Sequence, residues 1–143
     1  MKKILFKLDV VEGYPPVSME SVWSEPVASD LFKVRNIPFY TKDVSLDDEV
    51  AVDVGKDGEL LFKEVVRPSD NSTLRVVVFD EGVNKIEAIQ ETLVRLGCAW
   101  EGMGTRLFSV NVPRAINLDD VLAVLEEYTR DGWADYEYGM IRQ

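Results

Sequence analysis

The stretch Ser72-Thr-Leu-Arg-Val-Val-Val-Phe-Asp80 is the strongest strand signal in the sequence. From residue 74 to residue 79, every side chain except Arg75 is apolar. A strand with one solvated face alternates between apolar and polar residues, whereas a strand covered on both faces does not. Arg75 shares a face with Val77 and Phe79. We therefore expect a central strand, with helices on one face and partial cover from the first half of the chain on the other.

From this strand onward the sequence repeats one pattern twice. The predicted elements are a strand at 73–80, a helix at 84–96 and a strand at 98–102, then a strand at 105–112, a helix at 117–130 and a strand at 133–140. The helices begin at Asn84 and Asn117, which are plausible N-caps, and end before Gly97 and Gly132. Strand–helix–strand twice in about seventy residues is typical of the ferredoxin-like βαββαβ unit. Both helices should cover one sheet face and leave the other open.

Each predicted helix has one apolar stripe at helical spacing. The stripes consist of Ile86, Ile89, Leu93 and Leu96 in the first helix, and of Leu118, Val121, Leu122, Leu125 and Tyr128 in the second. These stripes should pack on the sheet.

The first half of the chain has the signals of five short strands. They lie at 2–11, 19–27, 31–37, 49–54 and 59–66, and the last two flank the turn Gly55-Lys-Asp-Gly58. Short strands joined by tight turns favour a small β-barrel or a curled antiparallel sheet. The sequence thus predicts an α+β protein with a β-rich subdomain at 1–70 and a ferredoxin-like subdomain at 71–143.

The composition is that of a folded protein of 143 residues with 46 % hydrophobic residues. No apolar run approaches the roughly 20 residues that a membrane-spanning helix needs. The first residues have a basic start, but Lys7 and Asp9 interrupt the apolar run, so they predict a strand better than a secretory signal. The single cysteine, Cys98, excludes an internal disulfide framework and favours a reducing cytoplasm.

The chain contains no histidine. This removes the commonest general base, the commonest metal ligand and the usual Ser-His and Cys-His nucleophile systems. Zinc sites of the Cys/His type are excluded as well. We therefore predict no catalytic residue, no metal and no cofactor.

The formal net charge is −10, with −5 in residues 1–70 and −5 in residues 71–143. A surface this acidic repels nucleic acid and anionic membranes and attracts a basic partner. Acidic surfaces are also common simply because they keep proteins soluble.

Three short motifs and one tryptophan carry a resemblance to a known family. They are Asn36-Ile-Pro-Phe39, Val44-Ser-Leu-Asp-Asp-Glu-Val50, Ser72-Thr-Leu-Arg75 and Trp23. With them the chain resembles, over most of its length, an uncharacterised bacterial family, domain of unknown function 4265. The resemblance implies the order of elements and a bacterial origin. It brings no catalytic motif.

Acidic residues gather in two places. The first cluster consists of Asp43, Asp47, Asp48, Glu49 and Asp53, whose spacing differs from that of a calcium loop, so a solvated loop is the expectation. A glycosidase pair is the alternative there, but it would need a sugar cleft that the sequence does not indicate.

The second cluster lies around the last helix and strand, where carboxylates interleave with aromatic side chains. Such a mixture suits the anchor and rim of a protein–protein interface. A solvated helix face with core aromatics is the competing interpretation. The predicted partner-binding residues are Glu126, Glu127, Asp131, Trp133, Asp135 and Glu137, together with Asp47 and Asp48.

Other features favour structural roles. Gly102-Met-Gly104 lies between two predicted strands and therefore predicts a hairpin turn rather than a phosphate loop. Cys98 has no basic neighbour in the sequence and predicts a buried packing thiol. Trp23 and Trp100 are expected in the core.

These observations favour a non-catalytic acidic protein that neutralises a basic protein partner, such as an immunity protein that blocks a bacterial nuclease toxin. The alternative is a regulatory module that binds a small molecule, or dimerises, through an open sheet face. An enzyme that uses only carboxylates, Tyr, Ser or Arg ranks third. Oligomeric state is left open.

Overall fold

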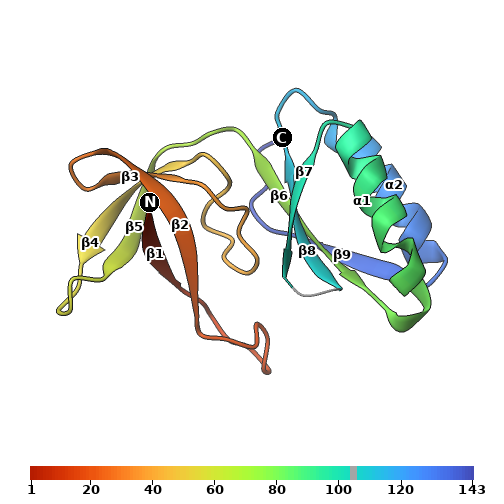
Figure 1. The fold of residues 1–143 in the computed structure, drawn as a ribbon, viewed down its shortest axis with the longest axis horizontal. Coiled ribbons are helices and arrows are strands. Elements are labelled where there is room, and N and C mark those ends of the chain that lie inside the picture. Colours follow the sequence, from red (N-terminus) through yellow and green to blue (C-terminus); the bar gives the residue numbers. More distant parts are fainter. Residues whose placement is uncertain (104–105) are drawn as a thin grey trace.

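The computed structural model describes residues 1–103 and 106–143, and within them the chain forms two antiparallel sheets and two α-helices. The N-terminal sheet contains β1 (Lys2–Lys7), β2 (Met19–Ala28), β3 (Leu31–Val34), β4 (Glu49–Val54) and β5 (Leu60–Arg67). The C-terminal sheet contains β6 (Ser72–Val78), β7 (Ala99–Met103), β8 (Leu107–Val112) and β9 (Ala134–Tyr138). The helices are α1 (Ile86–Arg95) and α2 (Leu118–Arg130), and a 3₁₀ turn, η1 (Asp80–Lys85), precedes α1. Figure 1 shows the sheets side by side along the long axis.

The N-terminal sheet follows the order β1-β2-β3-β4-β5, and consecutive strands are antiparallel. Its edge strands β1 and β5 meet in parallel at only two residue pairs, Ile4–Leu60 and Leu5–Leu61. With so short a seam, it is a curled antiparallel sheet rather than a full barrel. Its inner face holds a separate apolar core of Ile4, Phe6, Val22, Phe32, Val34, Val44, Val50 and Val52.

The C-terminal sheet has the order β7-β8-β6-β9 and is antiparallel throughout. Strand β6 is central, as the apolar stretch predicts. Both helices lie on the face that is turned away from the N-terminal sheet (Figure 1). The two predicted helical stripes pack there against Leu74, Val76 and Val78, which confirms the helical periodicity.

The two predicted helix starts differ in outcome. Asn117 caps α2 as predicted, because its side chain accepts a hydrogen bond of 2.9 Å from the N–H of Asp119. Asn84 does not cap α1, which begins two residues later, after η1. At Gly82 in η1, a Cβ atom would lie 2.3 Å from the carbonyl oxygen of Trp133, so this turn is fixed by close packing on the chain before β9.

Several predicted strand ends extend too far. The first strand ends at Lys7, not at residue 11, because residues 8–18 leave the sheet as a mostly exposed loop. The third predicted strand ends at Val34. Beyond it, the N–H of Trp23 donates a hydrogen bond of 2.8 Å to the side chain of Asn36 and not to a backbone carbonyl, so the ladder stops. Gly104 in the predicted hairpin turn at 102–104 and Thr105 in the predicted strand at 105–112 lie outside the described residues.

The prediction that both tryptophans belong to the core is wrong. Trp23 is 43 % exposed and Trp100 is 39 % exposed. On β2 the buried positions are Glu20, Val22 and Ser24, so strand alternation turns Trp23 outward. The prediction for Cys98 is confirmed, since its thiol is buried.

The helix-free face of the C-terminal sheet is only partly open. Residues 36–48 of the N-terminal half cover one end of it. The Ser109 hydroxyl donates to the carbonyl of Ile37 at 3.1 Å, and the hydroxyls of Ser45 and Thr73 lie 3.0 Å apart. Val77, toward the other end of β6, stays 40 % exposed. The first half of the chain therefore supplies the partial cover that the sequence predicts, and a fully open face is not present.

Asp48 is fully buried, so its prediction as a partner-binding residue is wrong. Its two carboxylate oxygens accept hydrogen bonds of 2.9 and 2.7 Å from the guanidinium of Arg142. The N–H groups of Ser45 and Ser69 also donate to it, each at 2.8 Å. Burial by itself would raise the pKa of Asp48, but these bonds hold it below its ordinary value of 3.8. Asp48 therefore has a structural role, because it connects the β3–β4 loop to the C-terminal segment through Arg142.

None of the helices in the described part of the chain is long and apolar enough to cross a membrane.

Replacing Arg142 with Met should lower the free energy of unfolding by about 3 kcal/mol, because it leaves the buried Asp48 carboxylate without its cation. The folded-state pKa of Asp48 lies below 3.8, so the pair stabilises the fold above that pH and loses its effect as pH falls through the folded value. Urea unfolding of both proteins at pH 7 and pH 3 should show a gap that narrows in acid.

Arg114→Met is the matched control, because Arg114 forms an exposed pair of 3.6 Å with Asp70. It should change stability by less than about 0.5 kcal/mol. Equal losses in both variants would show that the Asp48–Arg142 pair has no special role.

Candidate functional site

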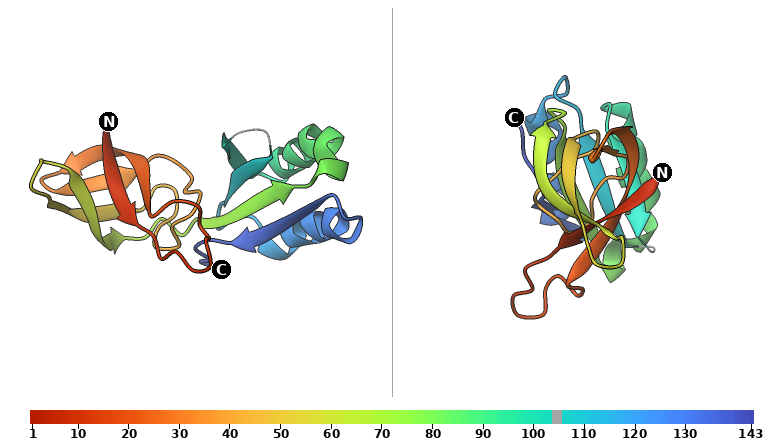
Figure 2. Two further views of the ribbon diagram at one scale, coloured as in Figure 1. Left: turned by 90° about the horizontal axis from the view of Figure 1, so that it is seen from below. Right: turned by 90° about the vertical axis from the view of Figure 1, so that its left-hand side faces the viewer.

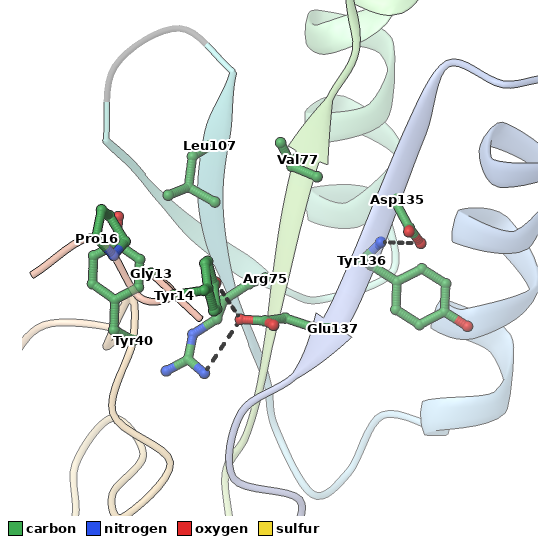
Figure 3. A pocket seen from close by; sticks show the side chains of 10 residues that line it. All are labelled: Gly13, Tyr14, Pro16, Tyr40, Arg75, Val77, Leu107, Asp135, Tyr136 and Glu137. Atoms are coloured by element: carbon green, nitrogen blue, oxygen red, sulfur yellow. Dashed lines mark hydrogen bonds and ion pairs between the residues drawn. The ribbon is translucent and has the colours of Figure 1, made fainter. Parts of the chain in front are cut away.

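A cleft of about 420 Å³ lies between the two sheets, beside the part of the C-terminal sheet that residues 36–48 leave uncovered. Figure 3 shows the side chains of the residues that line it; the ring of Tyr136 points away from the others, toward the helices. The N-terminal half contributes Gly13, Tyr14, Pro16 and Tyr40, and the C-terminal sheet contributes Arg75, Val77, Leu107, Asp135, Tyr136 and Glu137.

Strand register explains why distant residues meet here. Arg75 on β6 is paired with Glu137 on β9, and the next residue on the same face, Val77, is paired with Asp135. On the other side of β6, Val77 is paired with Leu107. All of them project from the helix-free face, because alternate residues of a strand share a side.

Arg75 is the central polar group of the cleft, and it is 2 % exposed. Its Nη2 donates to the carbonyl of Thr41, and its Nη1 lies 4.0 Å from a carboxylate oxygen of Glu137. Its Nε and Nη1 find no hydrogen-bond acceptor among the described residues. Burial lowers the pKa of Arg75, while the negative charges of Glu137 and Glu20 oppose that shift.

The loop at residues 8–18 reaches the cleft from β1, toward the junction of the two sheets (Figure 2, left). The Tyr14 hydroxyl donates to Glu137 at 2.9 Å, and the Tyr14 ring meets the Tyr40 ring edge-on with centroids 6.2 Å apart. Backbone bonds between Val11 and Tyr14, of 2.9 and 3.1 Å, shape the loop. Burial, followed by the bond to Glu137, raises the pKa of Tyr14 to about 12. Tyr14 thus connects the N-terminal half to β9 at Glu137, the same residue that lies beside Arg75.

The structure brings together only some of the predicted partner-binding residues. Glu126, Asp135 and Glu137 line a second groove of about 420 Å³ between α2 and β9, with Thr129, Tyr136 and Tyr138. The Tyr136 hydroxyl donates a hydrogen bond to Glu126, and this bond is the main reason why the pKa of Tyr136 is raised.

The remaining predicted residues are dispersed. Glu127 and Asp131 are exposed at the end of α2, near the second groove in sequence but not part of its lining. Trp133 is half-buried, with the Lys85 ammonium 4.7 Å above its ring. Asp47 lies in the β3–β4 loop and pairs with Arg35. Like the buried Asp48, it lines neither the cleft nor the second groove.

Sequence reasoning did not identify Tyr14, Tyr40 or Arg75 as site residues. Arg75 carried a signal, because it is the one charged residue in an apolar strand. Tyr14 carried none, since only the fold brings it to a residue 123 positions away in the sequence.

In the part of the chain that the structure describes, no group of three or more Cys, Asp or Glu side chains is arranged to hold a metal ion. Burial raises the pKa of the Cys98 thiol to about 11, so at neutral pH it is protonated and weakly nucleophilic.

The chain belongs to the family described as domain of unknown function (DUF4265), whose model matches residues 20–136. The predicted resemblance is thereby confirmed. No curated protein matches the sequence. A solved structure described as that of a hypothetical protein from Neisseria gonorrhoeae is similar, with a TM-score of 0.83, 21 % identity and coverage of 99 % of this chain and 96 % of that chain. At this identity the likeness shows a shared fold.

Replacing Tyr14 with Phe should remove the tyrosine that ionises near pH 12 and leave the fold intact, at a cost of less than about 1 kcal/mol at neutral pH. The folded pKa lies above the unfolded value of 10.0, so the bond to Glu137 stabilises the protein below pH 10 and is lost as pH rises toward 12. Spectrophotometric titration should show one late-ionising tyrosine fewer in the variant. An unchanged titration above pH 10 would contradict the Tyr14–Glu137 bond.

Proposed function

We propose that the protein is a non-catalytic binding module, and that a small molecule with a carboxylate group binds in the cleft between its two sheets. One observation carries the proposal. Arg75 is buried at the cleft, and two of its nitrogens, Nε and Nη1, have no hydrogen-bond acceptor among the described residues. Buried donors without acceptors cost free energy. A carboxylate would supply two acceptors with the planar geometry that a guanidinium fork fits.

The walls of the cleft suit a small ligand. Val77 and Leu107 provide apolar surface, Tyr14 and Tyr40 provide aromatic rings, and Arg75 provides a charged group that can fix orientation. Ligand sites of about 300–1,000 Å³ commonly combine apolar walls with few polar groups. This supports the alternative that the sequence left open, a regulatory module, with the ligand at the uncovered end of the sheet.

The available groups support binding more than catalysis. The chain has no histidine, and the raised pKa values of Tyr14 and Cys98 keep both groups protonated at neutral pH. A ligand between the sheets would contact both halves of the chain, and this is the basis we propose for regulation. The proposal includes the predicted subdomains at 1–70 and 71–143 and a ferredoxin-like assignment for the second, supported by its separate core and strand order.

A panel of small carboxylates should contain compounds that raise the melting temperature of the protein, because binding to the native state alone stabilises it. Arg75→Met should abolish these shifts, and it should lower the melting temperature of the free protein modestly, because the carbonyl of Thr41 loses its donor. Differential scanning fluorimetry measures both effects.

Val77→Trp should also abolish the shifts, by filling the cleft from β6. Val66→Trp is its control, because Val66 is 53 % exposed and does not line the cleft. Ligand shifts that persist in both Arg75→Met and Val77→Trp would rule out the cleft as the binding site.

A second candidate function is the predicted one, an acidic cytoplasmic protein that neutralises a basic partner such as a nuclease toxin. The net charge of −10 favours it, as does the groove between α2 and β9, where Glu126, Asp135 and Glu137 lie beside Tyr136 and Tyr138. No basic side chain is among the described residues that line this groove.

If this second function operates, reversing the charges of the groove residues Glu126 and Asp135 to Lys should weaken binding to a basic partner at least tenfold and flatten its salt dependence. The partner would be the protein that a low-salt pull-down enriches and that salt elutes, measured afterwards in purified form. Reversing the exposed residues Asp53 and Glu64 is the matched control. If both sets of substitutions weaken binding equally, the effect comes from the net charge of the protein and not from the groove.

A further inference from the structure

The charges around Arg75 restrict the kind of carboxylate that the cleft can accept. Glu137 lies 4.0 Å from Nη1, and the buried carboxylate of Glu20 also acts on the guanidinium. Asp135 lines the cleft two residues before Glu137. Among the described lining residues, Arg75 is the single basic one. The cleft therefore holds one positive and two negative side chains before any ligand enters.

A simple monocarboxylate would add a third negative charge to this site. Its attraction to Arg75 would be offset by repulsion from Glu137, whose carboxylate lies 4.0 Å from Nη1 of that arginine. A ligand that carries an ammonium group next to its carboxylate adds no net charge. Its cation can pair with Glu137 while its anion pairs with Arg75.

The bond between Tyr14 and Glu137 indicates how such an exchange would occur. Tyr14 is 51 % exposed on its loop, and its hydroxyl donates to the Glu137 carboxylate beside Arg75 (Figure 3). A ligand ammonium can replace this hydroxyl as the donor to Glu137. Displacing Tyr14 would also open a path to the two unpaired nitrogens of Arg75, which are covered in the free protein.

We infer that the ligand is a free α-amino acid with an apolar side chain, or an equally small zwitterion. Its carboxylate binds Nε and Nη1 of Arg75, its ammonium binds Glu137, and its side chain lies against Val77 and Leu107. This inference rests on the proposed small-molecule function and specifies the class of ligand for the same cleft.

The test compares three molecules of matched shape by isothermal titration calorimetry. They are L-leucine, 4-methylpentanoate, which lacks the ammonium, and 3-methylbutylamine, which lacks the carboxylate. Leucine, or another apolar amino acid of a panel with Val, Ile, Met and Phe, should bind, and removal of either charged group should weaken binding at least tenfold.

The outcomes separate the two proposals. If 4-methylpentanoate binds as tightly as leucine, the zwitterion inference is wrong and the proposed function stands. If neither the amino acids nor the carboxylate panel bind, both are wrong.

Variants of Glu137 provide a second readout. Glu137→Gln should weaken amino acid binding tenfold or more but leave or improve the binding of 4-methylpentanoate, because it removes the negative charge beside Arg75. Glu127→Gln, on the exposed end of α2, should change neither. Tyr14→Phe should strengthen amino acid binding, since it removes the donor that competes for Glu137. Loss of both ligands in Glu137→Gln, with an unchanged melting temperature, would contradict the assigned role of Glu137.

Discussion

Carboxylates that accept backbone N–H groups hold the two sheets of this protein together. Residues 36–48 connect β3 to β4 and lie against the C-terminal sheet without forming a strand, so most of their N–H groups have no ladder partner. Glu20 accepts from Phe39, Tyr40 and Thr41; Glu101 accepts from Ile37; and Asp48 accepts from Ser45. Buried amides without acceptors would each cost about 1–3 kcal/mol. The path of this segment, and with it the placement of one sheet on the other, depends on these three acidic residues.

The same constraint determines where the cleft lies. Because residues 36–48 cover the sheet at Thr73 and Ser109, the uncovered end is at Val77 and Leu107, and Arg75 lies at the boundary between them. Its Nη2 still reaches the carbonyl of Thr41 in the covering segment, while its Nε and Nη1 are buried without an acceptor among the described residues. The site is therefore a consequence of how far the irregular segment extends across β6.

The spacing of apolar residues in the sequence predicted the features that depend on short-range pattern. It found β6 as the central strand, both helical stripes and the Asn117 cap, because burial on one face imposes a repeat that the sequence records. It failed where a single polar residue has a long-range partner. Asp48 resembles a surface acid in sequence, and only the fold brings Arg142 to it, 94 residues away. Likewise, nothing in the sequence near Tyr14 indicates that it meets Glu137.

Arg75 and Arg142 each lie beside a carboxylate, but they differ in one physical respect that bears on function. Arg142 forms two hydrogen bonds to the fully buried Asp48, so its charge is matched in place, and the pair contributes to stability. Arg75 is the largest of the fully buried side chains among the described residues, yet Glu137 lies 4.0 Å away and two of the arginine nitrogens find no acceptor there. A guanidinium in that state favours the binding of any molecule that accepts its hydrogen bonds. Binding then removes the free-energy cost of the two buried donors that have no acceptor. For this reason Arg75, rather than the more numerous surface acids, is where ligand binding has the most to gain.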